Sequence, residues 1–137
     1  WAPVYVTYGP SNRTQMIRVP GMGRIENRTV DGASNPYLAC AVTLAAGLDG
    51  IAQKIEPGKP NNENLYEMPL DELRRQGIDV LPSTLHEAVD ELEKDAVIKE
   101  ALGETYADYY INVKREEWGR YHQSISQWET ENYLMVH

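Results

Sequence analysis

The chain has 137 residues, of which 42% are hydrophobic and 25% are charged. This length and balance are typical of one ordinary globular domain and exclude a largely disordered chain. No apolar stretch approaches a membrane span and the start lacks a leader pattern, so we expect no membrane partner. The net charge of −8 argues against nucleic acid as a partner.

The charge is unevenly distributed along the chain. Residues 1–30 contain four Arg and one Glu, a net charge of +3 within an otherwise acidic protein. A basic N-terminal part of this kind suits a small anionic ligand. The single cysteine, Cys40, cannot form an internal disulfide, so a reducing, cytoplasmic setting is expected. The chain begins at Trp1 instead of Met, which suggests a fragment of a longer protein.

Three short extended segments open the chain. The β-rich run from Val4 to Tyr8 ends at a Gly-Pro turn, and Met16 to Val19 is closed by a proline. Arg24 to Val30 follows a short Gly-Met-Gly connection. The pattern predicts part of an antiparallel sheet whose edges need further partners.

A long helix is expected next. Asn35 is placed as its N-cap and Pro36 occupies the first helical position, and the helical pattern continues to Lys54. Apolar residues cover most of its surface, so we expect a buried central helix with Cys40 in the core.

The remainder of the chain is predominantly helical in pattern. The expected helices are Leu70 to Gln76, a helix capped by Ser83, Ala96 to Leu102, and Glu104 to Glu131. The helix after Ser83 should bury a stripe formed by Leu85, Ala88, Val89 and Leu92. The predicted fold class is α+β, with a few short antiparallel strands at the N-terminal end followed by a helical majority.

The segment Arg24-Ile25-Glu26-Asn27-Arg28 has two different faces if it is a strand. Alternation places Arg24, Glu26 and Arg28 on one face and Ile25 on the other. One interpretation is a surface salt-bridge ladder, which contributes little stability. The other is an anion and metal site, in which guanidinium groups hold phosphate or carboxylate and Glu26 holds a hard cation. Spacing alone favours the ladder and leaves both open.

Two further arginines, Arg13 and Arg18, bracket the preceding strand. If the strands pair, four guanidinium groups could converge, and they would repel one another unless an anion compensates their charge. This favours a nucleotide polyphosphate, with Glu26 holding Mg²⁺ against the phosphates.

Other candidate constellations carry less chemistry. His86 is expected to be exposed on the helix capped by Ser83. His122 and His137 lack carboxylate or cysteine neighbours at metal-ligand spacing and are expected on the surface. Cys40 has no evident base partner, and the Gly-Met-Gly connection does not form a phosphate-binding loop.

Several short motifs follow one another in a recognisable order. They are Asn12-Arg13-Thr14, Ile17-Arg18-Val19-Pro20, Arg24-Ile25-Glu26-Asn27-Arg28, Asp31 through Asn35-Pro36-Tyr37-Leu38, Ala45-Ala46-Gly47-Leu48-Asp49-Gly50-Ile51, Asn64-Leu65-Tyr66, Leu81-Pro82 with the Leu85 helix, and Trp128-Glu129 with Tyr133. Their order and spacing resemble the glutamine synthetase family. The resemblance implies that residues 1–137 are the C-terminal portion of its catalytic domain. The N-terminal β-grasp domain and the first part of the catalytic domain are then absent.

This resemblance implies ATP-dependent ligation of an amine to the side-chain carboxylate of glutamate through γ-glutamyl phosphate, with Mg²⁺ or Mn²⁺. By family motif, Glu26 would be a metal ligand, and Arg18 and Arg24 would contact the nucleotide phosphates. Arg13 would contact phosphate and the bound glutamate, and Arg28 the glutamate or the transferring phosphoryl group.

The resemblance leaves some properties open. The amine could be ammonia, a small alkylamine or a polyamine, because the amine pocket lies largely upstream. The parent enzyme would be a large ring-stacked homo-oligomer and the isolated chain inactive; the alternative from another class is a non-catalytic binding or assembly module. The Gly-Met-Gly connection is shorter than the Lys-containing loop of many bacterial members. Tyr66 stands where some bacterial enzymes carry an adenylylated tyrosine, or is a packed loop residue.

Overall fold

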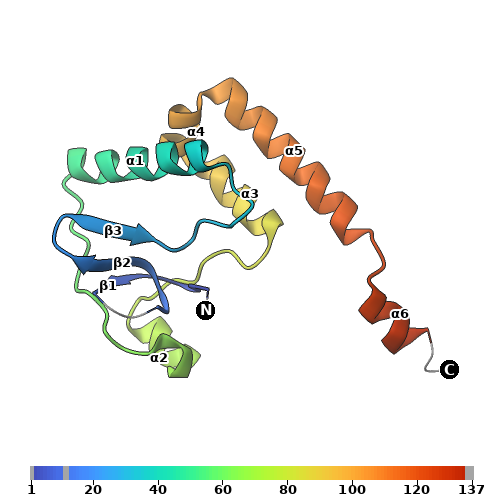
Figure 1. Cartoon of the computed structure of the whole chain (residues 1–137), viewed down its shortest axis with the longest axis horizontal. Helices are drawn as coiled ribbons and strands as arrows, with labels where there is room; N and C mark the ends of the chain where they lie inside the picture. Colours follow the sequence, from blue (N-terminus) through green and yellow to red (C-terminus); the bar gives the residue numbers. More distant parts are fainter. Residues whose placement is uncertain (1, 11–12, 135–137) are drawn as a thin grey trace. The chain divides into compact units, whose positions relative to one another are not determined.

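The computed structural model describes residues 2–10 and 13–134 (Figure 1). The chain divides into two compact units, one ending at Pro82 and the other beginning at Ser83. The predictions for Asn12 and His137 lie outside the described residues. None of the helices within the described ranges is long and apolar enough to cross a membrane.

The first unit contains a three-stranded sheet in the order β1-β2-β3 (Figure 1). The strands are β1 (Tyr5–Gly9), β2 (Gln15–Gly21) and β3 (Arg24–Asn27). β2 and β3 form the predicted antiparallel pair, in which Arg18 lies opposite Glu26. The prediction of an antiparallel sheet is wrong for β1, because β1 pairs with β2 in parallel.

The other edge of β1 explains this difference. Val6 N donates to Asp79 O at 2.9 Å and Leu81 N donates to Val4 O at 2.7 Å, so a distant segment pairs with β1 in the antiparallel sense. The strand is therefore held between β2 and a segment some seventy residues later. A local sequence pattern carries no information about such a partner.

A small core lies beside the sheet. It consists of the buried residues Tyr5, Leu65 and Leu73, with Met68 and Ile78 packed against them. Leu65 belongs to the short 3-10 helix η1 (Leu65–Glu67), and Leu73 to α2 (Leu70–Arg75), close to the predicted Leu70–Gln76. These few apolar side chains attach the η1–α2 segment to β1.

The loop before η1 is anchored on the sheet by polar contacts. Asn61 N donates to Tyr8 O at 2.8 Å, and the buried Gln15 side chain donates through Nε2 to the Asn61 carbonyl oxygen. Glycine is required at position 9, since a Cβ there would overlap both the Asn61 oxygen and the Gln15 side chain. The start of β2, and with it the strand that carries Arg18, is thereby fixed.

The helix α1 (Pro36–Ala52) begins where the sequence predicts. Asn35 Oδ1 accepts hydrogen bonds from the backbone N of Tyr37 at 2.9 Å and of Leu38 at 3.3 Å. Pro36 occupies the first turn, where its missing N–H costs nothing.

The expected burial of α1 is wrong. None of its residues is buried, Cys40 is exposed, and Leu48 and Ile51 are 56% and 75% exposed. An apolar pattern reports which surface can be buried, and burial follows only where another element covers that surface. Among the described residues, α1 contacts the sheet through one face, where Asn27 Nδ2 donates to Thr43 Oγ1 at 3.2 Å.

The second unit is helical over its described residues. Its helices are α3 (Leu85–Lys94), α4 (Ala96–Leu102), α5 (Glu104–His122) and α6 (Gln127–Tyr133). Val89, Ala107 and Ile111 are its buried hydrophobic residues. The predicted stripe of α3 is confirmed at Val89, whereas Ala88 is exposed.

Two helix starts differ from the prediction. Thr84, not Ser83, is the N-cap of α3, because its Oγ1 accepts from Glu87 N at 3.2 Å. Glu87 in turn accepts from the backbone N and Oγ of Ser83 at 2.7 Å. The predicted helix over Glu104–Glu131 is divided into α5 and α6, since Ser126 and Glu129 form a capping box that starts a new helix.

Candidate anion and metal site on the sheet

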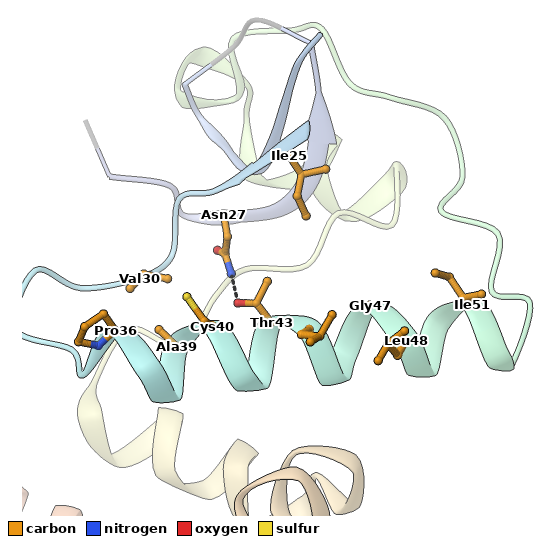
Figure 2. A pocket seen from close by; sticks show the side chains of 11 residues that line it. Ile25, Asn27, Val30, Pro36, Ala39, Cys40, Thr43, Gly47, Leu48 and Ile51 are labelled. Atoms are coloured by element: carbon orange, nitrogen blue, oxygen red, sulfur yellow. Dashed lines mark hydrogen bonds between the residues drawn. The ribbon is translucent and has the colours of Figure 1, made fainter. Parts of the chain in front are cut away.

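The two faces of β3 carry different chemistry, as strand alternation predicts. Ile25 and Asn27 point toward α1 and line a largely apolar pocket of about 580 Å³, which also includes Cys40 and Leu44 (Figure 2). Glu26 lies between these two residues in the strand and is paired with arginines instead. The strand therefore separates a scaffold face from a charged face.

Glu26 is held by two arginines on the charged face. Arg18 Nη1 lies 3.1 Å from Glu26 Oε2, and Arg28 Nη1 lies 2.7 Å from Glu26 Oε1. Arg18 is the register partner of Glu26 across the β2–β3 hairpin, and Arg28 N donates to Met16 O at 2.9 Å just beyond β3. The hairpin backbone thus sets the position of all three residues, called here the Arg18–Glu26–Arg28 cluster.

The cluster has one more positive than negative charge. The hydrogen bond from Arg28 is the largest cause that lowers the pKa of Glu26 below its ordinary value of 4.5; desolvation opposes it, and the hydrogen bond from Arg18 adds to it. Glu26 is therefore a carboxylate at neutral pH. Arg18 Nε is buried without a hydrogen-bond partner among the described residues, and a guanidinium group has five N–H donors in all.

The other two candidate arginines are placed differently. Arg24 starts β3 opposite Gly21, is exposed, and has no ion pair or hydrogen bond with the cluster among the residues described. Arg13 is exposed in the turn that precedes β2. The structure thus brings Arg18 and Arg28 together on one carboxylate, and Arg24 makes no ion pair with that carboxylate among the described residues.

Glu26 is the carboxylate of the cluster that could bind a metal ion. In the part of the chain that the structure describes, no group of three or more His, Cys, Asp or Glu residues could hold a metal. Mg²⁺ is usually bound by one or two carboxylates together with waters and substrate phosphates. Each oxygen of Glu26 accepts one hydrogen bond and keeps further lone-pair capacity. The residues therefore fit one ligand of a metal–phosphate complex, and they do not form a complete metal site.

Two other candidate residues, His86 and Tyr66, contact neighbouring residues of the chain. His86 is exposed, as predicted, and its Nε2 lies 3.7 Å from Asp90 Oδ2. The Tyr66 ring centroid is 6.1 Å from that of Tyr5, and its hydroxyl donates to the Ala2 carbonyl oxygen. These contacts support the packed-loop interpretation of Tyr66, and its modification stays a prediction.

Sequence reasoning missed the contribution of Gln15. Its side chain is fully buried and connects the start of β2 with the loop at Asn61. A polar residue in a short β-rich run gives no sign of a partner forty-six positions away. Only the position of Gln15 close to Arg18 in the sequence could have drawn attention to it.

A strand hairpin with an Arg/Glu face, followed by helices, defines an α+β fold, and comparison with known proteins identifies its family. A family model described as glutamine synthetase, catalytic domain, matches residues 1–133. The glutamate–methylamine ligase of Methyloversatilis universalis is 48% identical over 134 residues, which is 98% of this chain and 30% of that protein. The glutamine synthetase of Pyrococcus abyssi is 44% identical over 151 residues, covering 98% and 34%.

Solved structures agree with this assignment. A structure titled as a GmaS/ADP complex superposes with a TM-score of 0.86 at 41% identity, covering 98% of this chain and 30% of the other. Plasmodium falciparum glutamine synthetase has the same fold, with a TM-score of 0.73 at 23% identity and coverage of 96% and 34%. The chain therefore belongs to the glutamine synthetase family and matches its catalytic domain. It spans about a third of the length of these curated relatives. The predicted α+β fold class and the resemblance are confirmed.

Proposed function

We propose that the chain forms the C-terminal portion of the catalytic domain of a longer ATP-dependent ligase, which joins an amine to the side-chain carboxylate of glutamate. The observation that carries the proposal is the Arg18–Glu26–Arg28 cluster, where two guanidinium groups and one carboxylate share one face of a hairpin. The relatives named glutamine synthetase and glutamate–methylamine ligase support it. The longer protein is called the complete protein below.

The cluster suits phosphoryl transfer for electrostatic reasons. Transfer of a phosphoryl group spreads negative charge over its oxygens, and fixed cationic donors stabilise that charge. Bound Mg²⁺ or Mn²⁺ would supply further charge neutralisation and orient the phosphates. In this proposal Glu26 is one carboxylate ligand of that metal, and Arg18 and Arg24 hold the nucleotide phosphates.

The remaining arginines serve the acceptor side of the reaction. Arg28 contacts glutamate or the transferring phosphoryl group, and Arg13 contacts phosphate and the bound glutamate. Phosphorylation of the glutamate side chain gives γ-glutamyl phosphate, whose phosphate leaves when the amine attacks the carbonyl carbon. Because Arg28 is hydrogen-bonded to Glu26, the proposed metal ligand and the acceptor side are directly connected.

The acceptor amine can be decided by experiment. Ammonia and methylamine are both candidates, since the named relatives are 44% and 48% identical to the chain; putrescine represents the polyamines. We expect the complete protein to release ADP from ATP only when glutamate, a divalent metal and one of these amines are present. Failure with every amine would contradict the proposed function.

The chain alone is expected to be inactive. Its described residues contain no group of three or more His, Cys, Asp or Glu that could hold a metal, and the chain spans about a third of its relatives. These observations favour the second candidate, a non-catalytic binding or assembly module, only for the isolated chain or for a complete protein that fails the test above. A cytoplasmic setting and a large homo-oligomer remain part of the proposal.

A further inference from the structure

Glu26 occupies guanidinium donors that a bound phosphate would need. Its Oε1 accepts from Arg28 and its Oε2 from Arg18, so both oxygens are engaged in charge-assisted hydrogen bonds. A phosphate that reaches this face must share the donors with the carboxylate or displace it. The proposed metal ligand is therefore also a competitor of the proposed phosphate.

We propose that Glu26 is an exchangeable counterion, which neutralises Arg18 and Arg28 until a divalent cation draws its carboxylate away and frees the guanidinium groups for phosphate. This inference rests on the proposed function and adds a regulation to it. Phosphate binding at this face then depends on metal, beyond any effect of the metal on the phosphate in solution.

Exposure indicates that Glu26 is the group that moves. Its side chain is 41% exposed, against 30% for Arg18 and 16% for Arg28. A cation can therefore reach the carboxylate from solvent, while the arginine side chains are more closely packed. The exchange needs a rotation of one glutamate side chain and no change in the hairpin.

The charge of the cluster predicts that a bound metal ion strengthens phosphate binding. The cluster has a net charge of +1 while Glu26 is paired, and a divalent cation on Glu26 raises the local charge to +3. Metal and phosphate should then strengthen each other's binding, and this coupling must be reciprocal. Couplings between sites commonly amount to about 5- to 150-fold.

The test measures binding instead of turnover. Inorganic tripolyphosphate is titrated calorimetrically into the complete protein, with and without Mg²⁺ at matched free concentrations, for wild type, Glu26→Gln and Glu116→Gln. Glu116 is exposed on α5, so its substitution removes the same charge elsewhere. We expect Mg²⁺ to raise the wild-type affinity by about tenfold or more. Glu26→Gln should raise the metal-free affinity several-fold and abolish most of the metal effect, and Glu116→Gln should match wild type.

Three other results of the tripolyphosphate titration would contradict the proposals. An unchanged metal-free affinity in Glu26→Gln would show that Glu26 does not compete with phosphate and would overturn the exchange. An equal rise with and without Mg²⁺ would show a simple charge effect and would also overturn it. If wild type binds no tripolyphosphate even with Mg²⁺, the proposed function itself fails. Should Glu26→Gln not fold, Glu26→Ala provides the same comparison, because it also removes the carboxylate that pairs with both arginines.

Discussion

Two clusters in this chain combine arginine with carboxylates, and their charge ratios are opposite. On the sheet, Arg18 and Arg28 share the single carboxylate of Glu26. In the helical unit, Arg115 on α5 contacts two carboxylates of α3, Asp90 at 3.2 Å and Glu93 at 2.5 Å. The first cluster has a net charge of +1 and the second of −1.

In our proposal, this difference distinguishes a binding site on the sheet from a structural contact between helices. Arg115 donates hydrogen bonds to two carboxylates, and the bond to Glu93, followed by the bond to Asp90, raises its pKa. These bonds join two helices of the same unit. The Arg18–Glu26–Arg28 cluster has one carboxylate for two arginines, a charge ratio that in our proposal suits an anionic ligand. The two clusters contain the same residue types and differ in the number of carboxylates per arginine.

The largest expected difference between the two clusters is the effect of an arginine substitution on the turnover of the complete protein. Arg28→Gln in the complete protein should lower the rate of amine-dependent ADP release by roughly 10²- to 10³-fold, the usual effect of losing a donor to developing charge. Arg115→Gln should leave the rate close to wild type. Equal losses in both variants, measured with intact folds by circular dichroism, would contradict the distinction between the clusters.

Ligand-dependent stability provides a second test. A ligand at 100 times its Kd stabilises the folded state by about 2.7 kcal/mol. Tripolyphosphate with Mg²⁺ should therefore raise the Tm of wild type and of Arg115→Gln, and should have little effect on Arg28→Gln. A matching rise in Arg28→Gln, followed in thermal melts at constant ionic strength, would place the anion site elsewhere.

The pKa of Glu26 tests whether Arg28 pairs with it as the structure shows. Because its pKa is lowered in the folded state, its ion pair adds stability above pH 4.5, and this contribution is lost as pH falls through the lowered value. Carbon NMR of the side-chain carboxyl should give a midpoint below 4.5 in wild type. Arg28→Gln should move it upward, since Arg28 is the largest cause of the shift. A midpoint insensitive to Arg28 would contradict the observed pairing.

The smallest effect is expected for unfolding of the helical unit. Arg115→Gln removes the ion pairs between α3 and α5 and leaves Asp90 and Glu93 to repel each other. The urea midpoint should fall slightly, because exposed ion pairs contribute little. Lys114→Gln is a suitable control, as Lys114 pairs within α5 with Glu117. A larger fall for Lys114→Gln would show that the contact between the helices is unimportant.

The features that the sequence predicted correctly depend on local periodicity. Alternation placed Glu26 and Arg28 on the same side of the chain, and the two are hydrogen-bonded. The Asn35 cap marked the start of α1, and α4 has the predicted bounds Ala96–Leu102. Each of these is decided by residues two to four positions apart. The order of the short motifs also indicated the family, and the catalytic-domain match over residues 1–133 confirms it.

The features that it missed depend on distant partners. The parallel pairing of β1 accompanies its contact with Asp79–Leu81. Cys40 is exposed because its part of the α1 surface is left uncovered among the described residues. Alternation could not choose between a salt-bridge ladder and an anion site, because the same ion pairs occur in both. Our proposal of an anion site rests on the charge ratio and on the family.

Metal binding tests the central interpretation most directly. Mn²⁺ bound to the complete protein with tripolyphosphate can be counted by electron paramagnetic resonance in wild type and in Glu26→Ala. If Glu26 is a ligand of the metal that accompanies phosphate, the substitution should weaken Mn²⁺ binding by at least about tenfold. Equal Mn²⁺ affinity in the two proteins would contradict the metal–phosphate site and leave the cluster as a surface ion pair.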